Sequence, residues 1–296
     1  MTDTRALECD LIIKGGVTSG LVYPGAIARI ARDYRICSIG GTSAGAIAAA
    51  AAAAMEYGLQ TGGNPDAREQ LARVPGALGA PTSAGTALLQ QLFAADPGTR
   101  RLLNAALAAT AQKWPAAIWH LGREALIAAG LAAAITALLA WPHGAVVALA
   151  AAARLALPVL LAGLWLTLNR GTSAIRDNGL GLATGMARSG TSVGGDPAPA
   201  LTEWLHATLQ SLAGRPQDAP LTFGQLWTLD PAAAPASTGP RAIDLVLVTS
   251  DLNRLQSVSF PFLPQNHRLF IDRDEWARLF PAPVLAAIEA RAWPTS

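Results

Sequence analysis

The chain has 296 residues, of which 51% are hydrophobic and only 14% charged, and its formal net charge is +2. Soluble proteins average about 25% charged residues, so the apolar excess indicates extensive buried or membrane-embedded segments. The small net charge and the lack of Lys/Arg runs argue against nucleic-acid binding. The length suits one α/β domain carrying an insertion, or two small domains.

The cysteines and the polar start of the chain bear on its compartment. Cys9 and Cys37 are the only cysteines, and one possible pair without framework spacing fits a reducing environment. Residues 1–10 are too polar for the apolar region of a secretory signal. We therefore expect the globular part to lie in the cytoplasm. No His or Cys cluster has the spacing of metal ligands, so the sequence predicts no metal and no other cofactor.

The first part of the chain alternates strand patterns, glycine turns and helix patterns. Residues 9–14 (CDLIIK) predict a short buried strand, which ends in the glycine-bearing turn 15–20. A helix with Pro in its first turn is predicted at 24–33. A second strand is predicted at 35–39, and after another glycine turn a long Ala-rich helix at 44–57. This alternation is typical of the beginning of an open α/β sheet.

A loop-rich region with several prolines comes next. It covers 58–98, and we expect only short helices inside it, such as 84–94. Residues 99–112 predict a further helix. Beyond this helix the composition changes sharply.

Two apolar runs follow at 125–141 and 144–168, separated by a Pro-His-Gly break. A membrane helix needs about 20 apolar residues, with a range of about 17 to 25, so both runs are long enough. Arg123 and Arg170 flank the pair, and the positive-inside tendency then predicts that both ends face the cytoplasm. The runs can be a membrane-inserted hairpin or two buried Ala-rich helices of a soluble core. Arg154 opposes the membrane interpretation, because a mid-span charge costs about 2.5–3.5 kcal/mol on insertion scales.

Short elements are predicted in the remainder of the chain. From 170 to 199 the sequence is polar and glycine-rich. The apolar run IDLVLV predicts a buried strand at 243–248. The other expected elements are an amphipathic helix at 200–213, a short strand at 268–271, and helices at 274–280 and 282–292.

The pentapeptide Gly41-Thr42-Ser43-Ala44-Gly45 fits the pattern G-x-S-x-G. In a strand-to-helix turn, this spacing holds the serine in a strained backbone conformation, and the small flanking residues prevent clashes. The serine hydroxyl then stands exposed above the sheet edge. The N-terminus of the following helix directs N–H groups and a positive dipole end at the reaction centre. Ser43 is therefore the predicted nucleophile.

Two other serines compete with Ser43 on sequence alone. Ser192 lies in a second G-x-S-x-G match, and Ser83 lies in a near match that begins with Pro instead of Gly. Only Ser43 follows an apolar strand pattern and precedes a run of helix formers, so the context favours it. The alternative for Ser43 itself is a tight turn in which the serine merely caps a helix.

A glycine turn after the first strand supplies candidate oxyanion donors. Gly15, Gly16 and Val17 end the strand predicted at the same sheet edge as the nucleophile. An acyl-transfer enzyme needs two or more backbone N–H groups for the developing oxyanion. These three residues and Ala44 are the predicted donors. Nucleotide binding is the alternative, but the turn lacks both the G-x-G-x-x-G spacing and the Lys-Ser/Thr end of a P-loop.

The stretches LIIKGGVTSGLVYPGAI and YRICSIGGTSAGAIAAAAA resemble the first two motifs of the patatin-like phospholipase family. In that family a glycine-rich oxyanion loop precedes a G-x-S-x-G elbow by a similar distance. IDLVLVTSDLN, at 243–253, is similar to a later core strand of the family. The resemblance is specific over 9–57 and looser over 176–280, and 58–170 is mostly insertion. It implies a three-layer α/β/α sandwich, mainly parallel, and hydrolysis of lipid acyl esters.

The sequence departs from the family in two places. The family loop usually reads Gly-Gly-Gly-x-Arg/Lys-Gly, whereas Val17 replaces the third Gly here and Ser19 the basic residue. Backbone donors survive this change, but a positive charge is lost. The family also uses a Ser–Asp dyad with the Asp in an Asp-Gly motif. This chain contains no Asp-Gly dipeptide.

Several explanations for the proton acceptor therefore remain open. The carboxylate can come from a C-terminal part beyond this sequence or from a second chain. Alternatively, Asp196 or Asp177 serves without the usual glycine, although both suit turns. His206 and His267 could form a triad, although neither has a supporting motif. The last explanation is that the chain has no competent dyad.

Taken together, the patterns predict three parts. A patatin-like core occupies 1–120 and 171–296, and the apolar hairpin occupies 121–170. The predicted function is a serine-dependent lipid acyl hydrolase on the cytoplasmic face of a membrane, with a phospholipid or related ester as substrate and no nucleic-acid partner. The alternatives are a non-catalytic membrane-associated scaffold and a soluble esterase with a helical lid.

Overall fold

The computed structural model describes residues 5–16, 21–81, 87–93, 98–179, 181–183, 185–187, 199–230, 240–251, 254–261 and 270–291. The chain divides into two compact units. The first consists of Met1–Leu92 and Pro199–Ser296, and the second of Phe93–Ala198. The hairpin range predicted from the sequence, 121–170, lies inside the second unit.

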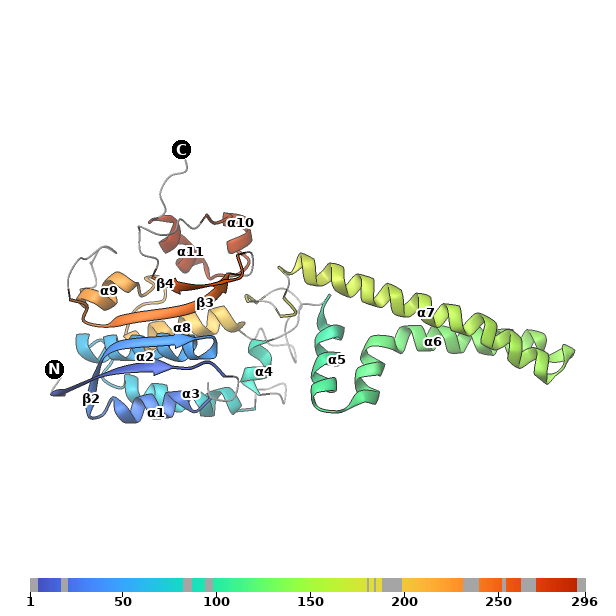
Figure 1. Cartoon of the computed structure of the whole chain (residues 1–296), viewed down its shortest axis with the longest axis horizontal. Coiled ribbons are helices and arrows are strands. Elements are labelled where there is room, and N and C mark those ends of the chain that lie inside the picture. The colour runs from blue at the N-terminus through green and yellow to red at the C-terminus, as the bar shows by residue number, and fades with distance from the viewer. Residues whose placement is uncertain are drawn as a thin grey trace. The chain divides into compact units, whose positions relative to one another are not determined.

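A four-stranded mixed sheet forms the centre of the first unit (Figure 1). Its strands are β1 (Leu7–Ile13), β2 (Tyr34–Thr42), β3 (Asp244–Asp251) and β4 (Gln256–Phe260), in that spatial order. The first three strands run parallel, and β4 pairs antiparallel to β3. The predicted mixed α/β class is therefore confirmed.

One helix connects the first two strands, and another follows the second strand. α1 (Tyr23–Ile30) has Pro24 in its first turn, where the fixed φ of proline suits a helix. α2 (Ala44–Thr61) begins directly after β2 and packs on β2 and β3. Since β2 lies between β1 and β3, α2 starts above the middle of the parallel strands.

The remaining helices of this unit are short. They are α3 (Ala67–Gly79), α4 (Leu88–Leu92), α8 (Leu201–Ala213), α9 (Phe223–Thr228), α10 (Arg273–Trp276) and α11 (Ala282–Glu289). α3 and α9 were not predicted, because Pro75 inside α3 and the brevity of α9 hide their periodicity. The strand predicted at 268–271 is wrong at 270–271, which lie outside any strand, and 268–269 lie outside the described residues. The strand that pairs with β3 is β4 instead.

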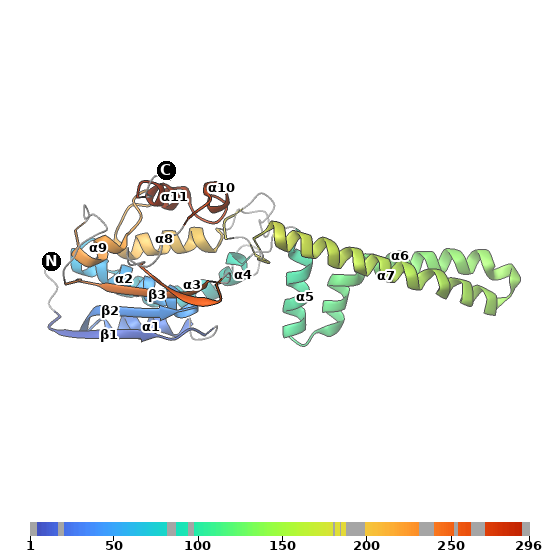
Figure 2. The ribbon, with the colours of Figure 1, turned by 45° about the horizontal axis from the view of Figure 1, so that its top comes forward.

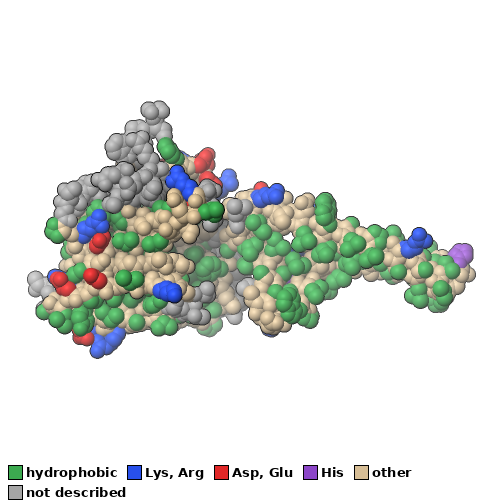
Figure 3. Space-filling model, in the orientation of Figure 1, with side chains coloured by type: hydrophobic (Ala, Val, Ile, Leu, Met, Phe, Trp, Pro, Cys, Tyr) green, Lys and Arg blue, Asp and Glu red, His purple; other side chains and the backbone are tan. Residues whose placement is uncertain are grey.

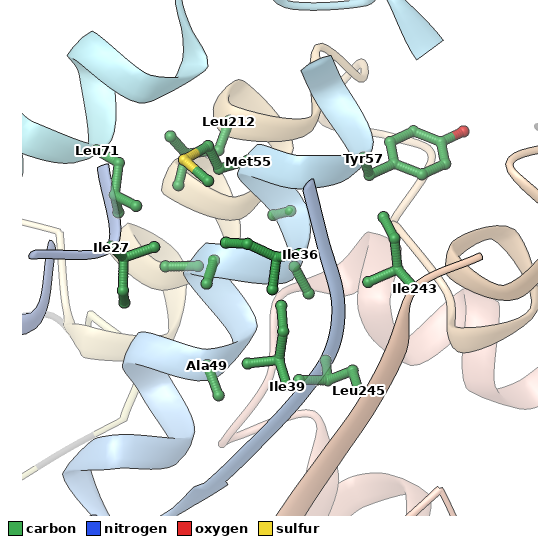
Figure 4. Packing of buried hydrophobic residues seen from close by; sticks show 14 of the residues in the cluster. Ile27, Ile36, Ile39, Ala49, Met55, Tyr57, Leu71, Leu212, Ile243 and Leu245 are labelled. Atoms are coloured by element: carbon green, nitrogen blue, oxygen red, sulfur yellow. The ribbon is translucent and has the colours of Figure 1, made fainter. Parts of the chain in front are cut away.

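Small residues of α2 allow close packing in the core (Figure 4). Ala49 of α2 lies near Ile36 and Ile39 of β2, and all three are fully buried. Further along the helix, a Cβ placed on Gly58 would lie 2.2 Å from the Leu212 carbonyl oxygen of α8. Contact at that distance is impossible, so glycine is required where α2 and α8 meet.

One charge of α2 is buried with a partner. The Glu56 side chain is 0% exposed and the Arg5 side chain 7%. The Arg5 guanidinium donates to both carboxylate oxygens of Glu56, at 2.7 and 3.0 Å. Arg5 also donates to the carbonyls of Ala31 and Tyr34. This two-bond geometry joins the start of β1 to the middle of α2.

The second unit is helical. α5 (Arg100–Thr110) precedes α6 (Trp114–Ala140), the short 3₁₀ turn η2 (Trp141–His143) and α7 (Ala145–Asp177). α6 and α7 lie side by side and antiparallel (Figure 2). By length and composition, both are long and apolar enough to cross a membrane.

Small residues lie between the two long helices, and large apolar side chains face outward. The buried residues of α6 are Ala117, Gly122, Ala125 and Ala129. A Cβ on Gly163 of α7 would lie only 2.6 Å from the Ala125 Cβ. In contrast, Leu138 is 76% exposed and Trp165 66%. Figure 3 shows hydrophobic side chains spread over the visible surface of these helices.

Candidate active site around Ser43

Ser43 lies in the tight connection between β2 and α2, at the carboxyl end of a central strand. Its backbone has φ 55° and ψ −129°. A non-glycine residue with positive φ is uncommon, and outside the left-handed helical region such a conformation costs about 1–3 kcal/mol. The sequence pattern predicted this strained strand-to-helix turn.

The two glycines of the pentapeptide are sterically required. A Cβ on Gly41 would lie 2.3 Å from the Gly45 carbonyl oxygen, and a Cβ on Gly45 would lie 2.4 Å from the Ile13 carbonyl oxygen. Both glycines are buried. The turn can therefore close tightly only because these positions carry no side chain, as predicted for the elbow.

The Ser43 hydroxyl does not cap the helix. Ser43 occupies the N-cap position of α2, yet its side chain makes no capping hydrogen bond, and the residue is exposed. The Ala46 N–H bonds instead to the Ser43 carbonyl oxygen, at 2.9 Å. The capping explanation for this serine is thus wrong, and its hydroxyl stays accessible to another molecule.

Gly15 packs directly against the serine. A Cβ on Gly15 would lie 2.7 Å from the Ser43 Cβ and 3.4 Å from the Ser43 Oγ. The Gly15 N–H donates to Thr42 Oγ1 at 3.3 Å. Tyr23 of α1 also donates its hydroxyl to the Lys14 carbonyl, at 2.8 Å. The predicted oxyanion loop therefore lies beside the predicted nucleophile and is held there by side chains of β2 and α1.

The predicted oxyanion donors differ in their surroundings. The Gly15 N–H already donates to Thr42 Oγ1, and Gly16 has an interaction partner of its own, which leaves Ala44 as the candidate within the described residues. Ala44 is the first residue of α2, and the first N–H groups of a helix have no partner within it. These amides together make the N-terminus of α2 favourable for an anion. Val17 lies outside the described residues.

The structure describes only some of the competing nucleophiles and candidate bases. Ser192, Ser83, Asp196 and His267 lie outside the described residues. Asp177 is the last residue of α7, in the second unit. His206 of α8 places its Nε2 2.8 Å from the Gln217 carbonyl oxygen. Among the residues that the structure describes, no carboxylate or imidazole hydrogen-bonds to Ser43.

The end of β3 carries a carboxylate that the sequence interpretation did not consider. Thr42 pairs with Val248, so the last residues of β3 extend past the level of Ser43. Asp251 is the last of them, and its Oδ1 accepts the Arg254 N–H at 3.1 Å. This bond stabilises the turn from β3 to β4. The polar exit of the IDLVLV strand was the signal that could have identified this carboxylate.

The cysteines and metal-binding side chains give no competing chemistry. Burial raises the pKa of the Cys9 and Cys37 thiols, which lowers the fraction of the reactive thiolate. Within the described ranges, no group of three or more His, Cys, Asp and Glu residues could hold a metal ion. The strained serine is therefore the chemically notable group of this sheet edge.

Comparison with known proteins gives one similarity. The chain is 37% identical over 297 residues to the "RpoH suppressor" of Rhizobium meliloti (strain 1021). The match covers 96% of this chain and 46% of that protein, so the chain spans about half the length of its relative. No protein-family model matches the chain. No solved structure matches it either.

Proposed function

We propose that this chain carries the nucleophile of a serine-dependent lipid acyl hydrolase that acts at a membrane. The observation that carries the proposal is the backbone of Ser43, strained at φ 55° with its hydroxyl uncommitted to the helix that it precedes. Strain of this kind persists where the surrounding structure enforces it, and it is concentrated at active sites. The serine also lies at the carboxyl end of parallel strands, where ligands of open α/β sheets bind.

The proposed reaction has two balanced steps. Ser43 Oγ bonds to the ester carbonyl carbon, its proton passes to a base, and the bond to the alcohol breaks as the alcohol takes up a proton. Water then attacks the acyl-enzyme, which releases the fatty acid and restores the serine. In both steps the Ala44 N–H stabilises the negative oxygen. Removal of one such donor from an oxyanion hole raises the barrier by about 2.7–4 kcal/mol.

The base is proposed to come from outside this sequence. None of the described carboxylates bonds to Ser43, and the similar protein is about twice as long as the chain. A further part of the polypeptide, or a second chain, would then bring an Asp to the serine. Asp196 and Asp177, together with Asp251 at the end of β3, remain the candidates within the chain. The three-layer patatin-like sandwich is part of the same proposal, because it would add further elements to the four-stranded sheet.

The hairpin supports a membrane-bound substrate. Small residues inside and large apolar residues outside suit helices in lipid, where close packing of small residues drives association. A soluble lid would instead bury its leucines. Trp141 at the turn and Trp165 near the other end of the apolar stretch fit the aromatic belts of a bilayer. Arg123 and Arg170 support the cytoplasmic side for the sheet-bearing unit.

Labelling of Ser43 by a fluorophosphonate probe tests the proposal. The chain, its Ser43→Ala variant and its Ser192→Ala variant are compared in detergent and in phospholipid vesicles, alone and as part of the longer polypeptide. We expect labelling and release of fatty acid that disappear in Ser43→Ala and survive in Ser192→Ala. Activity of the chain alone would place the base within it and make Asp196 and Asp177 the next targets. If the longer polypeptide is also inert, the proposed hydrolase is wrong.

A non-catalytic membrane scaffold is the second candidate. The observation in its favour is that no described carboxylate or imidazole hydrogen-bonds to Ser43. A scaffold would have no reason to maintain strain at this serine, since a glycine there would relieve it. In the scaffold case Ser43→Gly stabilises the protein without loss of function, whereas in the hydrolase case it abolishes labelling.

A further inference from the structure

We infer that the cavity between α2, α8 and β3 binds the acyl chain of the substrate. This inference rests on the proposed hydrolase and names the part of the ligand that the first unit holds. The cavity measures about 290 Å³. Ligand pockets usually measure about 300–1,000 Å³, so the cavity suits a slender ligand better than a whole phospholipid. It lies wholly within the first unit.

The cavity lies along the helix that begins at the nucleophile. Ala50 and Ala54 of α2 line it, and with Ser43 and Ile47 they occupy positions i, i+4, i+7 and i+11, which form one stripe of a helix. The distance from Ser43 to Ala50 along α2 is about 10 Å at about 1.5 Å per residue. Leu247 of β3 also lines the cavity, and it pairs across the sheet with Gly41, two residues before Ser43. An acyl chain attached at Ser43 can therefore run along α2 into the cavity.

The two walls leave room because they differ in side-chain size. α2 contributes alanines, whereas β3 contributes Leu245 and Leu247, which are two residues apart and therefore lie on the same face of the strand. α11 contributes Val284. The lining is thus mostly aliphatic.

The polar groups of the lining already have protein partners. His206 Nε2 contacts the Gln217 carbonyl, and the Gln210 amide donates to two backbone carbonyls and accepts the Leu221 N–H. Thr222 Oγ1 accepts the Gln225 N–H at the start of α9. A ligand therefore needs no polar atoms to satisfy the walls. A hydrocarbon chain meets these conditions.

Binding can be measured without catalysis. The Ser43→Ala chain is titrated with fluorescent fatty acids of increasing length in detergent below its micellar concentration. Burial of each methylene should strengthen binding about fourfold until the cavity is full. Ala50→Leu and Val284→Phe fill the cavity from opposite walls, so a folding defect of one variant does not remove the test. Ala286→Leu, on the exposed side of α11, is the matched control.

Both filling variants should weaken the binding of a dodecanoyl probe at least tenfold, and Ala286→Leu should leave it unchanged. In active protein they should slow hydrolysis of dodecanoyl esters at least tenfold and leave acetyl esters unaffected. Unchanged probe binding in both filled variants would overturn the inference, and so would equal losses for acetyl and dodecanoyl esters. Failure of Ser43 labelling with intact probe binding would instead overturn the hydrolase and keep the cavity as a fatty-acid site.

Discussion

α2 and the hairpin helices α6 and α7 are all rich in alanine, yet they use it in opposite ways. In α2 every residue from 51 to 58 is buried, and the alanines bring the helix close to the sheet and to α8. In the hairpin the small residues face the partner helix, and leucines and tryptophans face outward. Both regions are rich in alanine, but the hairpin also carries many leucines, and its large side chains point away from the partner helix.

This comparison separates two physical settings. In water, burial of large apolar side chains stabilises a fold, and an exposed Leu-rich surface of this extent indicates a binding partner or a membrane. In lipid, outward leucines cost nothing, and small residues are needed where helices touch. Matched substitutions in the two regions therefore test whether the first unit has the core of a soluble protein and whether the hairpin helices pack as helices do in lipid.

The largest difference is expected between two charges. Glu56 is buried with Arg5, so Glu56→Gln should leave the guanidinium short of its counter-charge and lower the free energy of unfolding by about 3–5 kcal/mol. Arg154 of α7 is exposed, and it has no ion pair among the described residues. Arg154→Leu should leave stability in detergent unchanged and favour membrane insertion by about 2.5–3.5 kcal/mol.

Denaturant unfolding in detergent measures the first effect, and a glycosylation-based insertion assay measures the second. Equal destabilisation by both variants in detergent would mean that Arg154 is held in a protein contact, against the lipid-facing interpretation. Stability unchanged in Glu56→Gln would mean that the Arg5 pair does not hold β1 to α2.

A second pair compares glycines. Gly15→Ala would place a methyl group 2.7 Å from the Ser43 Cβ, so the loop or the serine must shift. A shift near 1 Å can reduce a catalysed rate about 100-fold, and we expect that loss in the fluorophosphonate labelling rate. Gly130 of α6 has open space around it, and Gly130→Ala should only stabilise the helix, by about 0.5–1 kcal/mol. Labelling at the normal rate in Gly15→Ala would show that the loop does not form the oxyanion site.

The sequence predicted those parts of the fold that carry a local pattern. The elbow at Ser43, the glycine turn beside it and the two long apolar helices all depend on short spacings or on composition. It could not predict that Thr42 occupies the Gly15 amide, because that bond joins residues 27 positions apart across two strands. It also missed α3, whose Pro75 resembles a helix breaker, and β4, whose alternation is short. The base stayed unassigned because it depends on contacts between distant segments.

A third pair compares alanines of the two helix types. Ala52 of α2 is fully buried, and Ala52→Leu should overpack the core and lower the free energy of unfolding by about 1–3 kcal/mol. Ala134 of α6 is exposed, and Ala134→Leu should change stability by less than about 0.5 kcal/mol. Thermal unfolding in detergent, followed by circular dichroism, gives both values. A larger loss in Ala134→Leu than in Ala52→Leu would mean that this side of α6 is packed against protein.

The smallest expected effect concerns two threonines. Thr42 Oγ1 accepts the Gly15 N–H, whereas Thr136 in α6 donates its hydroxyl to the Ala132 carbonyl of its own helix. In Thr42→Val the Gly15 N–H loses its acceptor, and the hydrogen bond is worth about 1 kcal/mol. We therefore expect the labelling rate to fall about fivefold. Thr136→Val should leave labelling unchanged.

If Thr42 has only a structural role, Thr42→Val lowers the stability of the protein and leaves the labelling rate unchanged. The labelling rate is therefore measured at saturating and at low probe concentration. Thr42→Ser keeps the hydroxyl and should restore the rate. If Thr42→Ser is as slow as Thr42→Val, the methyl group and not the hydrogen bond matters at this position. The loop would then be held by packing and by the Tyr23 bond to the Lys14 carbonyl. Close contact of small residues would position it, as it does the hairpin helices at Gly163 and Ala125.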